Sequence, residues 1–337
     1  MLALVGLAAS GVSLGTLHVG EVGFGMLNLP LDKTQSTDAT DVMRAAADAG
    51  VNLIDTAEAY GFGASEKLAR SAVAESGTAS QLLYATKFAP VPWRSGPEAV
   101  VEACRASAER LGVERIPLYQ IHFPDLIQPL GALGIERRKD EEFWEGLARC
   151  YELGLAENVG VCNYGPTMTT RVHEALAKRG VPLASNQINL SLLFRKQGSL
   201  ATVERCRELG VRVIGYFPLA NGLLAGRYSP ESLPPFPKSL TMKKYIAGSD
   251  AHPDGVTPLI AAMRRIAEAR GKTVPQVAIN WVVCLGAIPI PGARNLRMAQ
   301  ENGGAMGWRL TDDEMRELEA ASDAVDFEFS SGGFKLE

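Results

Sequence analysis

From residue 51 the chain reads Val51-Asn52-Leu53-Ile54-Asp55-Thr56-Ala57-Glu58-Ala59-Tyr60, a short apolar run followed at once by a polar cluster. Two later runs have the same construction, Ala85-Thr86-Lys87 and Leu118-Tyr119-Gln120-Ile121-His122. Short apolar runs of this kind predict buried β-strands. Because the carboxyl ends of parallel strands meet at one edge of a sheet, we expect their polar residues to form a catalytic face.

The four polar groups at these strand ends suit proton transfer. A tyrosine with an unperturbed pKa of about 10 serves as a general acid near neutrality only if its neighbours ease the release of its proton. Lys87 beside Tyr60 would do so, and Asp55 would hold that lysine charged and fixed. His122 could orient a carbonyl group or pass on the proton.

Each of these residues also has a structural interpretation when it is taken alone. Asp55 could cap the next helix, and Tyr60 could be a packing residue with its hydroxyl near the surface. Lys87 could be a solvated charge, and His122 a structural histidine. We favour the functional interpretation because all four residues follow the carboxyl ends of predicted strands, where α/β folds gather their active sites.

The strands alternate with longer segments of helical period, a pattern typical of repeated strand and helix units around a parallel sheet. Seven strands are expected, at 51–56, 82–86, 118–122, 159–162, 184–189, 211–217 and 287–290, and closure of a barrel requires an eighth, which we place near Trp308. Continuous apolar strands indicate a sheet buried on both faces. A doubly wound dinucleotide fold would also satisfy this pattern, but its G-x-G-x-x-G element is missing, so a closed barrel is favoured.

Two sequence patterns locate helix ends. Val42, Ala45, Ala46 and Ala49 form an apolar stripe, and Gly50 is placed to end that helix. Near the carboxyl end, residues 311–314 read Thr-Asp-Asp-Glu, which predicts a capping box for a helix through residue 321.

Composition is ordinary for a globular enzyme and restricts the class of partner. The chain has 337 residues, 46% hydrophobic and 21% charged, and a net charge of -4 from 34 basic and 38 acidic residues without a long block of either sign. Nucleic acid and anionic membrane surfaces are therefore not expected partners. The 5 cysteines are scattered singly, which predicts a reducing compartment and no metal site. We expect a cytoplasmic protein, or a plastid protein if the apolar amino-terminal residues belong to a targeting segment.

With these runs in order, the chain resembles the aldo-keto reductase family over residues 15–322. The resemblance rests on the motifs at 52–61, 85–87 and 118–122, together with 160–163, 185–187, 216–219, 290–292 and 301–302. Within the family, the chain most resembles the bacterial and plastid types. It implies a (β/α)8 TIM barrel in a single domain at 15–325, an amino-terminal extension at 1–14 and a carboxyl-terminal tail at 326–337. Loops at 124–140 and 228–257 would be lids at the carboxyl-terminal face.

The resemblance also implies a reaction and a cofactor. NADPH would reduce an aldehyde or ketone by hydride transfer, with Tyr60 as the proton donor, Lys87 and Asp55 easing loss of its proton, and His122 orienting the carbonyl. The residues implied to bind NADPH are Gly25, Asp55, Cys162, Asn163, Gln187, Tyr216, Leu219, Gly222, Arg227, Gly292, Arg294, Glu301 and Asn302. Arg294, with Arg227, would meet the 2'-phosphate that distinguishes NADPH from NADH.

Some positions depart from the family pattern. Cys162 and Phe217 stand where serines are usual, and Met298 replaces a polar cofactor contact. A regulatory module that senses NADPH, as in the potassium-channel β-subunit branch of the family, is the alternative to a reductase. The fold alone also leaves room for unrelated barrel chemistry. The sequence sets neither the substrate, for which pyridoxal-type aldehydes, short sugars and lipid-derived aldehydes stay open, nor the oligomeric state.

Overall fold

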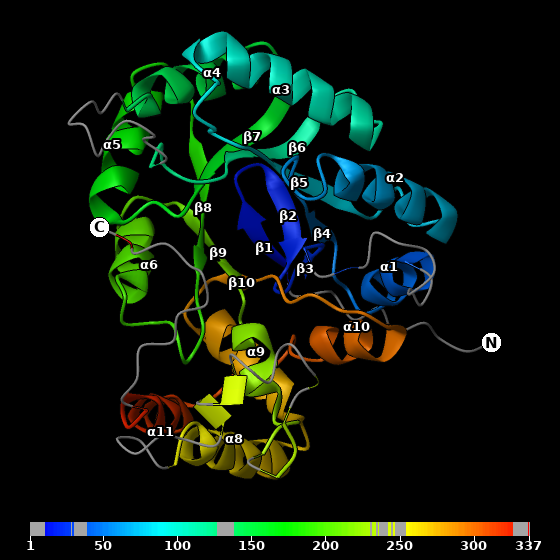
Figure 1. Ribbon diagram of the computed structural model, residues 1–337, viewed down its shortest axis with the longest axis vertical. Coiled ribbons are helices and arrows are strands. Elements are labelled where there is room, and N and C mark those ends of the chain that lie inside the picture. The colour runs from blue at the N-terminus through cyan, green and yellow to red at the C-terminus, as the bar shows by residue number, and fades with distance from the viewer. Residues whose placement is uncertain are drawn as a thin grey trace.

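Eight parallel strands curl into a barrel in the computed structural model of the chain (Figure 1). The structure describes residues 11–27, 29, 39–126, 138–229, 231–233, 235, 242, 243, 245, 246, 254–325 and 336. In barrel order the strands are β3 (Phe24–Gly25), β4 (Leu53–Asp55), β5 (Leu83–Phe88), β6 (Ile116–Ile121), β7 (Ala156–Cys162), β8 (Leu183–Asn189), β9 (Arg212–Tyr216) and β10 (Ile288–Pro289). The predicted (β/α)8 barrel is confirmed, and the seven predicted strands correspond to β4 through β10.

The eighth strand is not where the sequence analysis placed it. Trp308 lies in a loop, and its indole Nε1 donates to the Gly304 carbonyl at 3.2 Å, so the prediction of a strand there is wrong. The barrel is closed instead by β3, where Gly23 and Gly25 donate backbone hydrogen bonds to the carbonyls of Pro289 and Pro291 at 2.9 and 3.2 Å. A side chain at Gly25 would place its Cβ 2.8 Å from the Ile290 carbonyl oxygen, so this close approach requires glycine.

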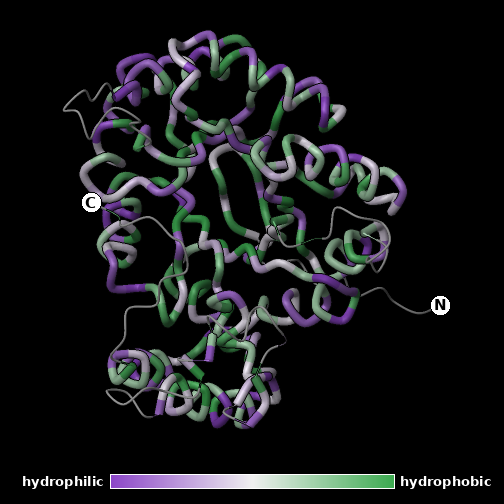
Figure 2. Tube along the Cα trace, viewed as in Figure 1, coloured by the Kyte–Doolittle hydropathy of each residue, from purple (hydrophilic) through white to green (hydrophobic). Residues whose placement is uncertain are grey.

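Helices surround the barrel, and their apolar faces cover its strands (Figure 2). They are α1 (Ala39–Asp48), α2 (Ala64–Ser76), α3 (Gly96–Leu111), α4 (Asp140–Glu152), α5 (Pro166–Ala177), α6 (Ser199–Glu208), the 3-10 helix η2 (Ala220–Ala225), α8 (Thr257–Arg270), α9 (Val274–Cys284), α10 (Leu296–Gly303) and α11 (Asp312–Asp323). The stripe predicted before Gly50 lies on α1, and the predicted capping box of Thr311 and Glu314 is formed at α11. No helix in the described ranges combines the length and apolarity needed to cross a membrane.

An amino-terminal hairpin fills one end of the barrel. It consists of β1 (Gly11–Leu14) and β2 (Leu17–Gly20), which pair antiparallel. Leu14, Leu17 and Val19 are buried against residues that point into the barrel, among them Leu118 and Ile214. The boundary predicted between residues 14 and 15 therefore falls in the turn of this hairpin, and we propose that the domain begins at or before Gly11.

Much of the two predicted lids lies outside the described residues. In the first, 127–137 are not described, and in the second this holds for 230, 234, 236–241, 244 and 247–253. The described parts place both connections after carboxyl ends of strands, the first after β6 and the second after β9 and η2.

Candidate active site

A buried ion pair lies at the carboxyl ends of β4 and β5. Lys87 Nζ is 2.6 Å from Asp55 Oδ2, and the two side chains are 0% and 4% exposed. The same ammonium group donates to the carbonyl of Thr56 at 2.7 Å. Burial alone disfavours a charged lysine, but Asp55, together with Tyr60 and Cys162, outweighs the effect of burial, and the pKa of Lys87 is raised above its ordinary value. Lys87 is therefore a fixed positive charge beneath the strand ends.

Tyr60 lies beside this charge, in the loop between β4 and α2. Its hydroxyl oxygen is 3.5 Å from Lys87 Nζ, and the ammonium nitrogen is 5.1 Å from the centre of its ring. Burial raises the pKa of Tyr60, Lys87 opposes that rise, and the net pKa lies above the ordinary value. Tyr60 is thus protonated near neutrality, with a cation placed to stabilise the phenolate that loss of its proton would leave.

His122 follows β6 and faces Tyr60, with the ring centres 5.6 Å apart in an edge-on arrangement. Burial, together with the positive charge of Lys87, lowers the pKa of His122 to about 3. The imidazole is therefore neutral at physiological pH and can donate a hydrogen bond from one nitrogen while accepting at the other. Its buried Nδ1 has no hydrogen-bond partner within the described part of the chain.

Two side-chain amides connect the remaining strand ends to these groups. Gln187, on β8, donates from Nε2 to Asp55 Oδ1 at 2.7 Å. Asn163, directly after β7, donates from Nδ2 to the His122 carbonyl at 2.9 Å and accepts from the Tyr216 hydroxyl at 2.8 Å. Asn163 has a φ of 64°, a left-handed conformation that asparagine tolerates better than most residues. Residues from six consecutive strands therefore meet in one hydrogen-bonded group.

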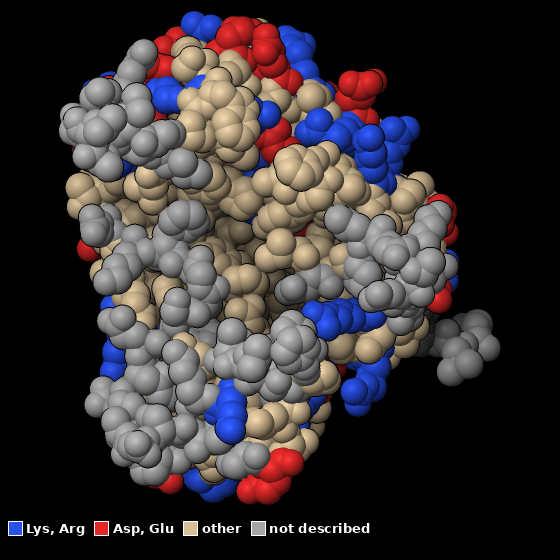
Figure 3. All heavy atoms as spheres, viewed as in Figure 1, with Lys and Arg blue, Asp and Glu red and all other residues tan. Residues whose placement is uncertain are grey.

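A cavity of about 330 Å³ opens over this group, and Figure 3 shows the molecule hollowed near its centre among mostly uncharged residues. Asp55, Tyr60 and His122 line the cavity, whereas Lys87 lies buried below it. The residues with an implied cofactor role that line it are Gly25, Asp55, Asn163, Gln187, Tyr216, Leu219, Gly222, Arg227, Gly292 and Arg294. Cys162, Glu301 and Asn302 do not line it; Asn302 Nδ2 instead donates to the Gly292 carbonyl at 3.3 Å.

Several lining residues were not among those that the sequence implied to bind NADPH or to take part in catalysis: Leu27, Phe217, Pro218, Asn221, Ala225, Tyr228, Ile290, Pro291 and Met298. Most of them follow β9 or β10, so their position after the end of a strand was the only sequence feature that could have indicated that they line the cavity. Phe217, Ala220 and Asn221 have positive φ angles of 52°, 46° and 56°. Backbone strain of this kind clusters at functional sites, and no sequence pattern reveals it for phenylalanine or alanine.

Comparison with known proteins gives similarities that span nearly the whole chain. A family model described as "Aldo/keto reductase family" matches residues 17–323. The chain is 39% identical over 326 residues to "Pyridoxal reductase, chloroplastic" of Arabidopsis thaliana, across 92% of this chain and 85% of that protein. A glycerol dehydrogenase structure from Gluconobacter oxydans has a TM-score of 0.75 at 27% identity, covering 95% of this chain and 96% of that one. The structure of an aldo-keto reductase from Bombyx mori in complex with NADP has a TM-score of 0.70 at 25% identity, covering 93% and 92%.

Proposed function

Since the chain belongs to the aldo/keto reductase family, we propose that it reduces an aldehyde or ketone to the alcohol with NADPH, using Tyr60 as the proton donor. The observation that carries this proposal is the buried Asp55–Lys87 pair beside Tyr60, at a cavity that Tyr60 and His122 both line. A buried cation next to a tyrosine hydroxyl is the arrangement that proton donation to a developing alkoxide requires.

NADPH, when bound, supplies the hydride that the carbonyl carbon accepts. The residues of the chain then have separate tasks. The Tyr60 hydroxyl donates its proton to the carbonyl oxygen as that oxygen gains negative charge, and Lys87, 3.5 Å away, stabilises the resulting phenolate. Asp55 keeps Lys87 charged and in place. Neutral His122 holds the carbonyl oxygen next to Tyr60 by a hydrogen bond.

The residues around the cavity fit the parts of NADPH. Asn163 and Gln187 each donate one amide hydrogen within the protein and keep a second for the nicotinamide carboxamide. The ring of Tyr216 lies at the cavity for stacking. Gly222 has a φ of 100°, and a Cβ added to it would meet only the Tyr228 ring edge at 4.0 Å, which leaves its backbone open to a phosphate. Arg227 and Arg294 are exposed cations at the cavity.

We expect Arg294→Gln to raise KM for NADPH by roughly 10- to 150-fold, with little change in KM for NADH, because charge-assisted hydrogen bonds to a phosphate are worth roughly 1.5–3 kcal/mol. Steady-state kinetics with both cofactors measures the difference. Arg297→Gln is the matched control, since Arg297 is an exposed arginine on α10 that does not line the cavity. An equal effect on both cofactors would show that Arg294 does not contact the 2'-phosphate.

Pyridoxal is the substrate we propose first. The Arabidopsis relative, 39% identical, is named for its reduction. The cavity also presents Leu27, Phe217 and Tyr228, which provide apolar and aromatic surface for a planar aromatic aldehyde.

The test of this function is NADPH oxidation, followed by absorbance and compared with NADH, over a panel of pyridoxal, glyceraldehyde, a medium-chain alkanal and a quinone. Faster turnover with NADPH and a preference for pyridoxal would support the proposal. Tight NADPH binding without turnover of any panel member would contradict it and would favour a module that senses NADPH.

A further inference from the structure

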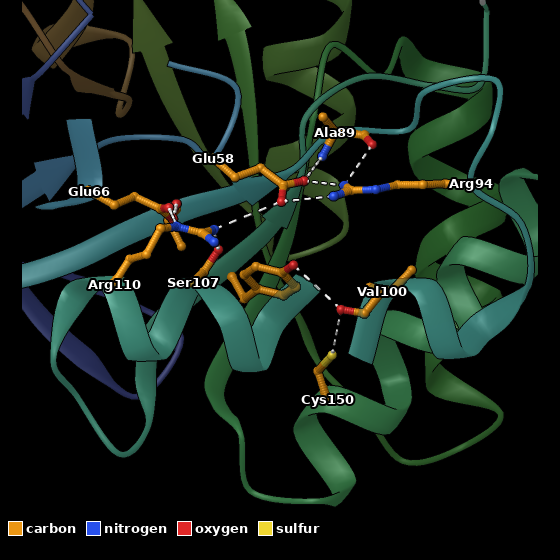
Figure 4. Close-up of polar contacts among 10 residues, drawn as sticks. Glu58, Glu66, Ala89, Arg94, Val100, Ser107, Arg110 and Cys150 are labelled. Carbon is orange, nitrogen blue, oxygen red and sulfur yellow. Dashed lines mark hydrogen bonds and ion pairs between the residues drawn. The ribbon is translucent and has the colours of Figure 1, made fainter. Parts of the chain in front are cut away.

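Glu58 belongs to the polar cluster quoted at the start of the sequence analysis but has no role in the chemistry described above. Its side chain is only 9% exposed. The carboxylate forms an ion pair with Arg94 through both oxygens, the longer contact from Arg94 Nη2 to Oε2 measuring 3.2 Å. Its Oε1 also accepts the backbone N–H of Ala89 at 2.7 Å (Figure 4). Glu58 is thus a fully engaged buried carboxylate.

These contacts join the two chain segments that carry Tyr60 and Lys87. Glu58 is two residues before Tyr60, and Ala89 is two residues after Lys87. The backbone N–H of Glu58 itself donates to the Lys87 carbonyl at 3.4 Å. Arg94, in the loop after β5, also donates to the Ala89 carbonyl at 3.2 Å. The loop that carries Tyr60 is therefore attached to the end of β5 twice, through the side chain of Glu58 and through its backbone N–H.

A second arm extends the cluster to α2 and α3. Arg110 on α3 has Nη2 3.9 Å from Glu58 Oε2, and its Nε is 2.5 Å from Glu66 Oε2. Glu66, on α2, accepts from the hydroxyl of Thr86 at 2.6 Å, and Thr86 is the residue before Lys87. Figure 4 shows the two glutamates and two arginines in one continuous set of contacts. The start of α2 is thereby attached to the same strand.

Stability alone is a weak reason for such a cluster, because the desolvation penalty of a buried ion pair often cancels its attraction. The position of the cluster beside Tyr60 and Lys87 suggests a stronger reason. The Tyr60 hydroxyl and Lys87 Nζ are 3.5 Å apart, at the outer limit for a hydrogen bond, so a small shift of the loop would separate them. We propose that Glu58 is a positioning residue, which through Arg94 and Ala89 holds Tyr60 within reach of Lys87. This inference rests on the proposed function, because it assigns Tyr60 as the acid.

Glu58→Gln tests this inference. The amide keeps the shape of the side chain and an acceptor for the Ala89 N–H, but it removes the charge that pairs with Arg94. We expect kcat to fall by roughly 10- to 100-fold while the Kd for NADPH stays within about twofold, because a displacement of about 1 Å at a reacting group has effects of that size. A split between kcat and cofactor binding is not expected from a general loss of stability.

The pH profile gives a second readout. The titratable groups around Tyr60 are Asp55, Lys87, His122, Cys162 and Tyr216, and those around Glu58 are Arg94, Arg110 and Tyr119. Lys87 favours the ionised form of Tyr60, so moving the two apart raises the pH at which Tyr60 ionises. Oxidation of the alcohol requires ionised Tyr60. The rate of alcohol oxidation rises with pH as Tyr60 ionises. In Glu58→Gln the midpoint of this rise should therefore lie at a higher pH than in the wild type.

A matched control lies at the opposite end of the barrel. Glu21 is 4% exposed, forms an ion pair with Arg309 and accepts the backbone N–H of Gly307 at 3.1 Å. Glu21→Gln thus breaks the same kind of buried contact far from the cavity. It should lower the melting temperature without changing kcat or the pH profile. Arg94→Lys is a second variant, which keeps the charge but not the two-point contact and should give a smaller change of the same sign.

The measurements distinguish this inference from the proposed function. Ionisation of Tyr60 can be followed without turnover, from the near-ultraviolet absorbance difference between each variant and the same variant carrying Tyr60→Phe. An upward shift of that ionisation in Glu58→Gln, absent in Glu21→Gln, supports the positioning role even if the carbonyl substrate is wrong. Unchanged ionisation and kcat, or equal loss of activity in Glu58→Gln and Glu21→Gln, would overturn it.

Discussion

Tyr60→Phe should lower carbonyl turnover by roughly 10²- to 10⁴-fold, the range that general acid catalysis contributes, while the Kd for NADPH changes by less than about twofold. The hydroxyl is the only group removed, and it acts on the substrate oxygen. The phenyl ring that remains keeps the contact with His122, whose ring centre is 5.6 Å away. Initial rates of NADPH oxidation give the turnover, and a fluorescence titration gives the Kd.

Tyr84→Phe is the control for this substitution. Tyr84 is also a buried tyrosine, on β5, but it packs in the apolar cluster beneath α1 and α2 and does not line the cavity. Its replacement should leave turnover unchanged. If Tyr60→Phe abolished NADPH binding, or if it kept wild-type turnover, Tyr60 would not be the acid.

Of the substitutions proposed, Lys87→Met should lower the stability of the protein most, and it should also abolish turnover. It removes the partner of a nearly buried carboxylate, and breaking a buried ion pair on one side costs roughly 3–5 kcal/mol of unfolding free energy. The phenolate of Tyr60 would also lose its stabilising cation. Urea denaturation measures the first effect, and NADPH oxidation measures the second.

Asp55 provides the means of separating these two effects. In the double variant Asp55→Asn with Lys87→Met, the buried negative charge is gone, so much of the stability should return while turnover does not. Lys196→Met is the control for loss of a lysine, because its ion pair with Asp323 is 59% and 55% exposed and should contribute little. Recovery of activity in the double variant would show that Lys87 has only a structural role.

Strand positions could be predicted from the sequence where a short apolar run ends at a polar residue, as it does at 51–56, 82–86 and 118–122. The run at 51–56 became β4, and that at 118–122 became β6. The capping box at Thr311 and Glu314 was predictable for a similar reason, since it depends on residues three apart in the chain. Local patterns of this kind need no knowledge of the rest of the fold.

Closure of the barrel could not be predicted in this way. β3 has only two residues, too few to form a pattern, and its backbone donors meet the carbonyls of Pro289 and Pro291 more than 260 positions away. The eighth strand was placed near Trp308 only because barrel closure requires one, and there Asn280 donates a hydrogen bond to the Trp308 carbonyl at 2.9 Å in place of a neighbouring strand. Long-range pairing of this kind overrides local preference.

The hydrogen-bond partners of the side chains in the candidate site could not be predicted from the sequence either. The sequence suggested that Asn163 and Gln187 face a ligand, yet nothing in it links Gln187 to Asp55, which lies 132 positions earlier. The role of Glu58 was also not evident, because a glutamate two residues before Tyr60 has no partner until Arg94 folds back onto it. Such partners depend on how the strand ends converge.

The hairpin of β1 and β2 also determines how ligands exchange. Because its apolar residues fill the amino-terminal end of the barrel, cofactor and substrate would both enter from the opposite end, where the cavity lined by the described residues opens. A nicotinamide held by Gln187, whose amide contacts the buried Asp55, would lie deeper than the carbonyl compound. The cofactor must then bind before the carbonyl compound and leave after the alcohol product. We therefore expect an ordered kinetic scheme.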